Sequence, residues 1–161
     1  MATITVGGNE FNTIGNLPEV GTKAPDFVLV TEDLSRKTLN DFKGSRLILN
    51  ISPSIDTSTC ATSVRVFNKK ATELENTVVA YVSRDLPFAM KRFCGAEGIE
   101  NVITLSDYIS GEFGVNYGLN FINGPIEGLN SRCIIVIDEE GIILHTEQVQ
   151  ETGDEPNYEA A

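Results

Sequence analysis

Short runs of apolar residues, separated by glycine, proline and polar turns, mark the strands that the sequence predicts. Ile4 and Val6 alternate with polar residues and Gly7-Gly8 supplies a turn, so the chain is expected to open with a β-hairpin. Residues 46–51 are nearly all apolar, which is typical of a strand buried on both faces. Further strands are expected at residues 27–30, 78–82, 102–105, 133–137 and 142–144.

Apolar spacings of three and four residues predict helices between these strands. After the polar loop 52–59, one helical face carries Val64, Phe67, Ala71 and Leu74. A second helix is expected over residues 85–96, because Asp85 can cap its start and Pro87 is tolerated in a first turn. Two shorter helices are expected, one at residues 112–117 and one at the end of the acidic tail 151–161.

Strands alternate with helices in the middle of the chain, and a hairpin follows near the end. That order predicts an α/β fold in which a mixed central sheet is flanked by helices on both faces. The 161 residues fit a single domain, 1–161, with room for a real core. No linker or internal repeat divides the chain.

Composition and charge argue against several classes of binding partner. The net charge of −11 argues against binding to the phosphate backbone of a nucleic acid. No apolar run approaches the length of a transmembrane helix, and the first residues lack the basic start and apolar stretch of a signal peptide. We therefore expect a cytoplasmic protein with no membrane partner.

The chain has three cysteines, Cys60, Cys94 and Cys133, and one histidine, His145. An odd number of widely spaced cysteines is a poor framework of structural disulfides, and in a cytosolic chain it indicates redox chemistry or buried thiols. There is no Cys-x-x-Cys motif and no pair at metal-ligand spacing, so neither a metal nor another cofactor is expected.

Cys60 is expected in the first turn of the helix that follows the polar loop. Unpaired N–H groups and the helix dipole favour an anion there, and the thiolate is the reactive form of cysteine. Thr57 lies at the spacing of an N-cap, and Pro53 can wall the pocket without an N–H group. Periodicity alone leaves open that Cys60 merely extends a core face, but three hydroxyls and one carboxylate within 56–60 favour a reactive site.

Two segments of the sequence resemble a known family. Pro53-Ser-Ile-Asp-Thr57-Ser-Thr-Cys60 fits the Pro-x-x-x-Thr-x-x-Cys signature of peroxiredoxins, and the run through Asn68 is similar to their thiol peroxidase branch, the atypical two-cysteine peroxiredoxins of bacterial type. Residues 85–98 resemble the segment that carries the resolving cysteine in that branch. The resemblance covers nearly the whole chain and implies a thioredoxin fold.

The resemblance also implies a reaction and the residues that perform it. Cys60 would reduce hydrogen peroxide and organic hydroperoxides and become a sulfenic acid, and Cys94 would resolve it as a Cys60–Cys94 disulfide that thioredoxin reduces. Thr57 would hydrogen-bond the thiolate and the peroxide, and Arg132 would lie beside the sulfur from a neighbouring strand. Members of the family usually form homodimers.

Other interpretations of these residues remain. Arg65 lies five positions after Cys60, about 140° around the helix, so a salt bridge or surface role is expected for it. Without the resemblance, Cys94 reads as part of an apolar helix face, and Cys133 is expected to be inert in the core. If both Cys60 and Cys94 lie in helices, local unwinding must precede a disulfide. The competing functions are a thiol–disulfide oxidoreductase acting on proteins and a non-catalytic thioredoxin-fold module.

Overall fold

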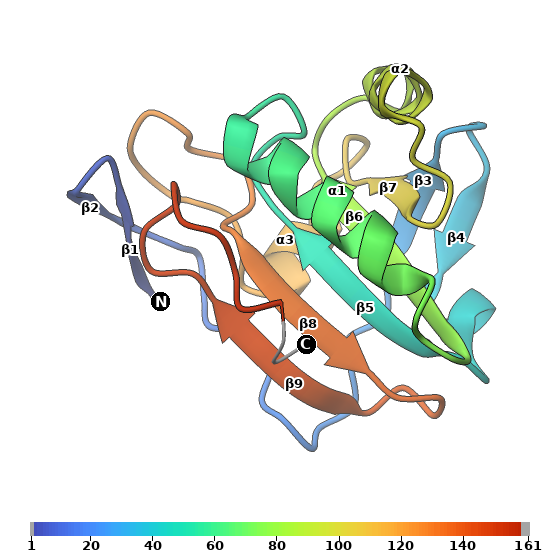
Figure 1. Cartoon of the computed structure of the whole chain (residues 1–161). Coiled ribbons are helices and arrows are strands. Elements are labelled where there is room, and N and C mark those ends of the chain that lie inside the picture. Colours follow the sequence, from blue (N-terminus) through green and yellow to red (C-terminus); the bar gives the residue numbers. More distant parts are fainter. Residues whose placement is uncertain (1, 159–161) are drawn as a thin grey trace.

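A computed structural model of the protein describes residues 2–158, and its main element is one mixed β-sheet (Figure 1). The strands are β3 (Val28–Thr31), β4 (Arg36–Thr38), β5 (Arg46–Ile51), β6 (Thr77–Ser83), β7 (Ile103–Ser106), β8 (Cys133–Ile137) and β9 (Ile143–Gln148). They lie in the order β4-β3-β7-β6-β5-β8-β9. β5, β6 and β7 run parallel and the other neighbouring pairs are antiparallel, which confirms the predicted mixed sheet.

The N-terminal hairpin forms a small sheet of its own. Its strands are β1 (Thr3–Val6) and β2 (Asn9–Asn12), which pair antiparallel. Gly7 and Gly8 have φ angles of 59° and 83°, and a tight hairpin turn of this kind needs positive φ at both positions. The predicted hairpin is therefore confirmed, and its turn explains why two glycines occur there.

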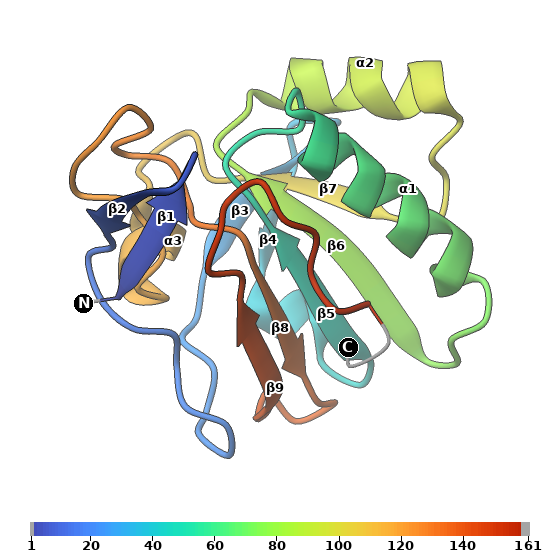
Figure 2. The ribbon, with the colours of Figure 1, turned by 60° about the vertical axis from the view of Figure 1, so that its left-hand side comes forward.

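Helices cover both faces of the main sheet (Figure 2). They are α1 (Ser58–Ala71), α2 (Pro87–Glu97), α3 (Glu112–Asn116) and the short 3-10 helix η1 (Leu39–Phe42). Successive side chains of the central strand β5 point to opposite faces of the sheet, so they belong to two different core clusters. Leu47 and Leu49 of β5 join the cluster that contains α3, whereas Ile48 joins the cluster beneath α1 and α2.

This topology brings three chain segments together at one end of the central strands. β5 and β6 are parallel, so the loop that leads into α1 and the loop that leads into α2 leave the sheet at the same end. β8 runs antiparallel to β5 with Ile51 opposite Cys133, so the start of β8 meets the end of β5. Residues far apart in sequence therefore surround the first turn of α1.

The structure overturns two details of the predicted helices. Leu74 does not belong to the buried face of α1, because that helix ends at Ala71 and the Leu74 side chain is 42% exposed in the following turn. Asp85 does not cap α2. The N-cap of that helix is Leu86 with no side-chain bond, and the Asp85 carboxylate turns toward Ser54 and Ile55 instead.

The acidic tail is described only in part. Residues 151–158 form turns and extended chain, and residues 159–161, the end of the tail where a helix was predicted, lie outside the described residues. The tail is held by its contacts, since Glu151 accepts hydrogen bonds from Gly7 and Gly8 of the hairpin turn. No helix within residues 2–158 is long and apolar enough to cross a membrane.

Candidate active site

Cys60 occupies the third position of α1, directly after the loop that leaves β5. Thr57 is the N-cap residue in an extended conformation, and its hydroxyl oxygen accepts a hydrogen bond from the backbone N–H of Cys60 at 3.3 Å. The Cys60 side chain is 0% exposed. The sulfur therefore lies at the positive end of a 14-residue helix and away from bulk water, where a negative charge is favoured by the dipole.

Arg132 supplies the charge partner of this sulfur. It immediately precedes β8 and is 2% exposed, and its Nη1 donates a hydrogen bond to Cys60 Sγ at 3.2 Å. Its Nε donates to the carbonyl of Thr152 at 2.9 Å, which fixes the guanidinium plane. A buried guanidinium needs a charged or strongly polar partner, and a Cys60 thiolate would satisfy that need.

The floor of the site is polar and buried. Ser52 and Tyr81 are fully buried at the ends of β5 and β6, and their hydroxyl oxygens lie 2.5 Å apart. Burial raises the pKa of Tyr81, and the proximity of Cys60 raises it further, so the phenol stays neutral. Pro53 follows Ser52 at a bend in the loop and is itself buried, at the base of the segment that leads to Cys60.

Cys94 lies in the last turn of α2 as a free thiol and is 7% exposed. Burial, and to a smaller extent the negative charge of Glu32, raise its pKa from the ordinary value of 9.0 to about 11. Cys94 is therefore held protonated near neutral pH while α2 is folded. Cys60 and Cys133 are also free thiols, so the structure shows the fully reduced protein.

The two remaining candidates lie where the sequence placed them. Arg65 points away from Cys60 and pairs with Glu97 of α2, with Nη2 2.9 Å from a carboxylate oxygen, which confirms the expected salt bridge. Its guanidinium also lies 6.0 Å from the centre of the Phe93 ring. Cys133 is fully buried in β8 and burial raises its pKa strongly, as an inert core thiol requires.

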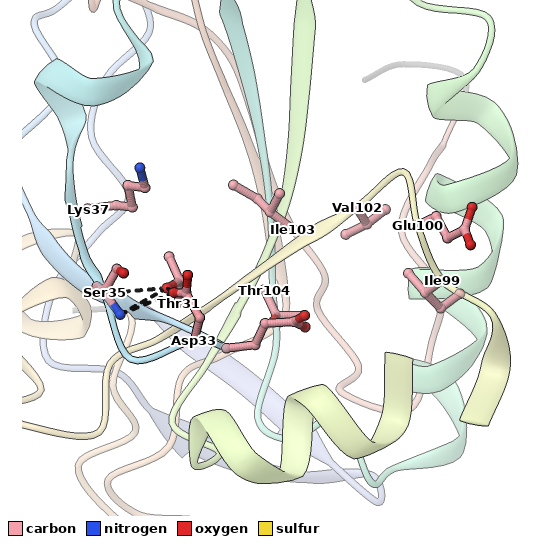
Figure 3. Close-up of a pocket in the computed structure, with 10 residues that line it drawn as sticks. Thr31, Asp33, Ser35, Lys37, Ile99, Glu100, Val102, Ile103 and Thr104 are labelled. Atoms are coloured by element: carbon pink, nitrogen blue, oxygen red, sulfur yellow. Dashed lines mark hydrogen bonds between the residues drawn. The ribbon is translucent and has the colours of Figure 1, made fainter. Parts of the chain in front are cut away.

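One hollow in the described chain lies apart from Cys60. It has a volume of about 510 Å³ and is lined by the β3–β4 turn and the segment from α2 into β7 (Figure 3). In Figure 3 Thr31, Asp33 and Ser35 gather at the turn, while Ile99 and Val102 lie across the pocket. The hollow therefore adjoins the end of the helix that carries Cys94. Nowhere in residues 2–158 do three or more His, Cys, Asp or Glu side chains gather as metal ligands.

Sequence reasoning missed one residue near the site and reached another only through the resemblance. Asp85 was expected to cap α2, but its carboxylate accepts bonds from the loop that leads to Cys60. Arg132 lies 72 positions from Cys60, and no local pattern signals that the two side chains meet. The strand register of β5 and β8 brings them together.

The fold is that of a thioredoxin-like oxidoreductase, and a buried cysteine thiol lies beside an arginine at the start of α1. The chain belongs to the Redoxin family, whose model matches residues 19–161, and within it to the thiol peroxidases. It is 50% identical over all of its 161 residues to a thiol peroxidase of Mycobacterium bovis, 96% of which is covered. The protein is thus a peroxiredoxin-type oxidoreductase.

Solved structures agree with this assignment. A peroxiredoxin-like protein from Aquifex aeolicus is 35% identical and superposes with a TM-score of 0.94 over 99% of this chain and 93% of its own. A thiol peroxidase from Chromobacterium violaceum is 21% identical and superposes with a TM-score of 0.91 over 98% of this chain and 91% of its own. The second likeness supports the fold alone.

Proposed function

We propose that the protein is a thioredoxin-dependent peroxidase that reduces hydrogen peroxide and organic hydroperoxides and so serves antioxidant defence. The observation that carries this proposal is the 3.2 Å hydrogen bond from Arg132 Nη1 to Cys60 Sγ at the N-terminus of α1. A guanidinium aimed at a buried sulfur favours the thiolate and stabilises charge that develops on an oxygen bound beside it.

In the first step the Cys60 thiolate attacks the terminal oxygen of the hydroperoxide. The S–O bond forms as the O–O bond breaks, and the leaving alkoxide or hydroxide takes a proton and departs as alcohol or water. Cys60 is oxidised to a sulfenic acid and the peroxide is reduced by two electrons. Arg132 stabilises the charge on the breaking bond, Thr57 hydrogen-bonds the sulfur and the peroxide, and Pro53 walls the pocket.

In the second step Cys94 attacks the sulfur of the Cys60 sulfenic acid. A disulfide forms, the sulfenic oxygen leaves as water, and a reduced thioredoxin dithiol then returns the two electrons. Bridged Cα atoms must lie within about 7 Å, and both cysteines sit within helices in the reduced protein. We therefore propose that the first turn of α1 and the helix α2 refold on oxidation.

A coupled assay tests this function. Wild-type protein should consume thioredoxin-derived electrons only when a hydroperoxide is present. Cys60→Ser should be inactive, whereas Cys94→Ser should react once and stop as a sulfenic acid that a dimedone adduct identifies by mass. Cys133→Ala is the matched control and should turn over like the wild type, because Cys133 is buried in β8.

Three results would overturn the proposal. Peroxide consumption that survives Cys60→Ser would remove Cys60 from the chemistry. Oxidation of thioredoxin without peroxide would favour a thiol–disulfide oxidoreductase, and activity unaffected by either cysteine change would favour a non-catalytic module.

From the resemblance to the family we also propose that the chain acts as one domain, 1–161, in a cytoplasmic homodimer. Sedimentation of the reduced protein should give twice the 17.5 kDa mass of the chain. Thermal unfolding should show one cooperative transition. A monomer at micromolar concentration would contradict the dimer.

A further inference from the structure

The Asp85 carboxylate connects the end of β6 to the loop that leads to Cys60. Its Oδ1 accepts a hydrogen bond from Ser54 Oγ at 2.7 Å, and its Oδ2 accepts from the backbone N–H of Ile55 at 2.7 Å and from Ser83 Oγ at 2.6 Å. The Asp85 backbone is held as well, since its N–H donates to Ser83 Oγ and its carbonyl accepts from Ser106 Oγ. Asp85 is thus fixed to two strands of the sheet.

A continuous series of hydrogen bonds runs from Asp85 to Cys60. The Ser54 carbonyl accepts from the Thr57 hydroxyl at 3.1 Å and from the Thr57 N–H at 3.3 Å. The Thr57 hydroxyl oxygen in turn accepts from the Cys60 N–H at 3.3 Å. Ser54 and Thr57 are the only residues between the carboxylate and the cysteine in this series.

Other restraints act mainly at the start of the loop, where Ser52 donates its N–H to the carbonyl of Val82 and its hydroxyl pairs with that of Tyr81. Residues 52–57 contain no helix or strand, and Asp56 and Thr57 are exposed. Ile55 is fully buried and packs in the core beneath α1, but a single apolar contact does not fix the rotation of a turn. Bonds to a charged acceptor are stronger than bonds between neutral groups, so the Asp85 carboxylate is a strong restraint on the Ser54–Thr57 turn.

We propose that Asp85 is a positioning residue for Cys60, holding the Ser54–Thr57 turn so that Thr57 caps α1 and the sulfur stays beside Arg132. The inference rests on the proposed role of Cys60 as the peroxide-reducing thiol. Reacting groups must be held within about 0.5 Å of the productive geometry, and groups on loops depend on their supporting bonds for that precision.

This role predicts opposite effects on the two steps of the reaction. Oxidation of Cys60 needs the turn in the observed geometry, so loss of Asp85 should slow it. Disulfide formation needs the first turn of α1 to move toward Cys94, so the same loss should leave that step unchanged or faster. General destabilisation of the protein gives no reason for such a split.

The test compares three variants of the full-length protein. Asp85→Ala removes all three bonds to the carboxylate. Asp85→Asn can keep them, since the amide oxygen can accept from Ile55 and Ser83 while the amide nitrogen donates to Ser54 Oγ. Asp138→Ala is the matched control, because Asp138 is also half-buried and its carboxylate accepts from the N–H groups of Glu140 and Ile142 in the β8–β9 turn.

Rapid mixing with hydrogen peroxide, an alkylating quench and intact-mass analysis measure both steps. Asp85→Ala should lower the second-order rate of Cys60 oxidation by ~10–100-fold, without slowing conversion of sulfenic acid to disulfide. Asp85→Asn should recover most of that rate, and Asp138→Ala should match the wild type. Ser54→Ala removes one of the three bonds to the carboxylate and the bond from the Asp56 N–H to Ser54 Oγ. It should slow oxidation by about fivefold and serves if Asp85→Ala does not fold.

Hydrogen exchange at the Ile55 and Cys60 amides gives a readout that needs no peroxide. Exchange in the reduced protein should be faster in Asp85→Ala than in Asp138→Ala. The inference is overturned if oxidation rates and exchange of the two variants agree within about twofold, or if Asp85→Ala slows both steps by the same factor. A wild-type protein that ignores peroxide while the exchange difference persists would instead refute the proposed function.

Discussion

Replacing Gly98 by alanine should make Cys94 react faster with thiol reagents, although the added methyl group does not contact the Cys94 side chain. Gly98 ends α2 in the left-handed conformation with φ 67°, and its N–H closes the helix on the carbonyl of Cys94. A Cβ added at Gly98 would meet nothing within 4 Å. The substitution therefore perturbs the helix end only through the cost of a left-handed alanine.

The size of the effect follows from that cost. Placing alanine at positive φ destabilises the helix end by about 1 kcal/mol, which raises the population of opened α2 by about fivefold. Opening also returns the pKa of Cys94 from about 11 toward the ordinary 9.0, which raises its thiolate fraction by about 100-fold. Labelling of Cys94 then proceeds through the opened helix, and its rate should rise by about fivefold.

The assay is alkylation of the reduced protein by iodoacetamide at pH 8, with the Cys94 peptide quantified by mass spectrometry. Gly44→Ala is the matched control, since Gly44 has φ 91°, lies in the turn before β5 and likewise offers open space to a Cβ. Both variants lose comparable stability, but only Gly98→Ala opens α2. Equal acceleration in the two variants would mean that Cys94 reacts through global unfolding, and the reasoning would be refuted.

Three further predictions concern the same two thiols. Arg132→Met should lower the rate of Cys60 oxidation by about 10²–10³-fold in the rapid-quench assay, because one preorganised donor to the developing charge is lost. Thr57→Ala should cost about 1 kcal/mol and lower the Tm by about 2–4 °C, with Thr57→Ser restoring both, as calorimetry can show. The raised pKa of Cys94 contributes about 2–3 kcal/mol of stability that is fully present below pH 9 and is lost as the pH rises to about 11. Between pH 9 and pH 11 the Tm of the wild type should therefore fall more steeply than the Tm of Cys94→Ala.

Features set by local chemistry could be predicted from the sequence. The apolar run of β5, the two-glycine hairpin turn and the capping of α1 by Thr57 each depend on a few neighbouring residues, and the structure shows all three. The position of Arg65 followed from helix geometry alone, because 100° per residue places it away from Cys60. Its partner Glu97 lies on another helix and could not be named.

Features set by tertiary contacts could not be predicted in this way. Asp85 is a residue type favoured at N-caps and lies just before a helix. Its carboxylate instead accepts hydrogen bonds from Ser54 and Ile55 of a distant loop and from Ser83 at the end of β6. Leu74 continues an apolar spacing, but the chain must turn after Ala71 to enter β6 and so leaves Leu74 outside the core. Arg132 has no local signal at all, and only strand register carries it to Cys60.

The unequal states of the two reacting thiols set the order of the proposed reaction. A thiol with a pKa of about 11 is ionised in only about one molecule in 10⁴ at pH 7, so folded Cys94 cannot compete with Cys60 for peroxide. The Arg132 guanidinium donates a hydrogen bond to Cys60 Sγ, whereas Cys94 is held protonated mainly by burial and to a smaller extent by the negative charge of Glu32. Cys94 becomes a nucleophile only when α2 opens, and in the proposed role the bonds of Asp85 hold the loop in the geometry in which Cys60 meets the peroxide.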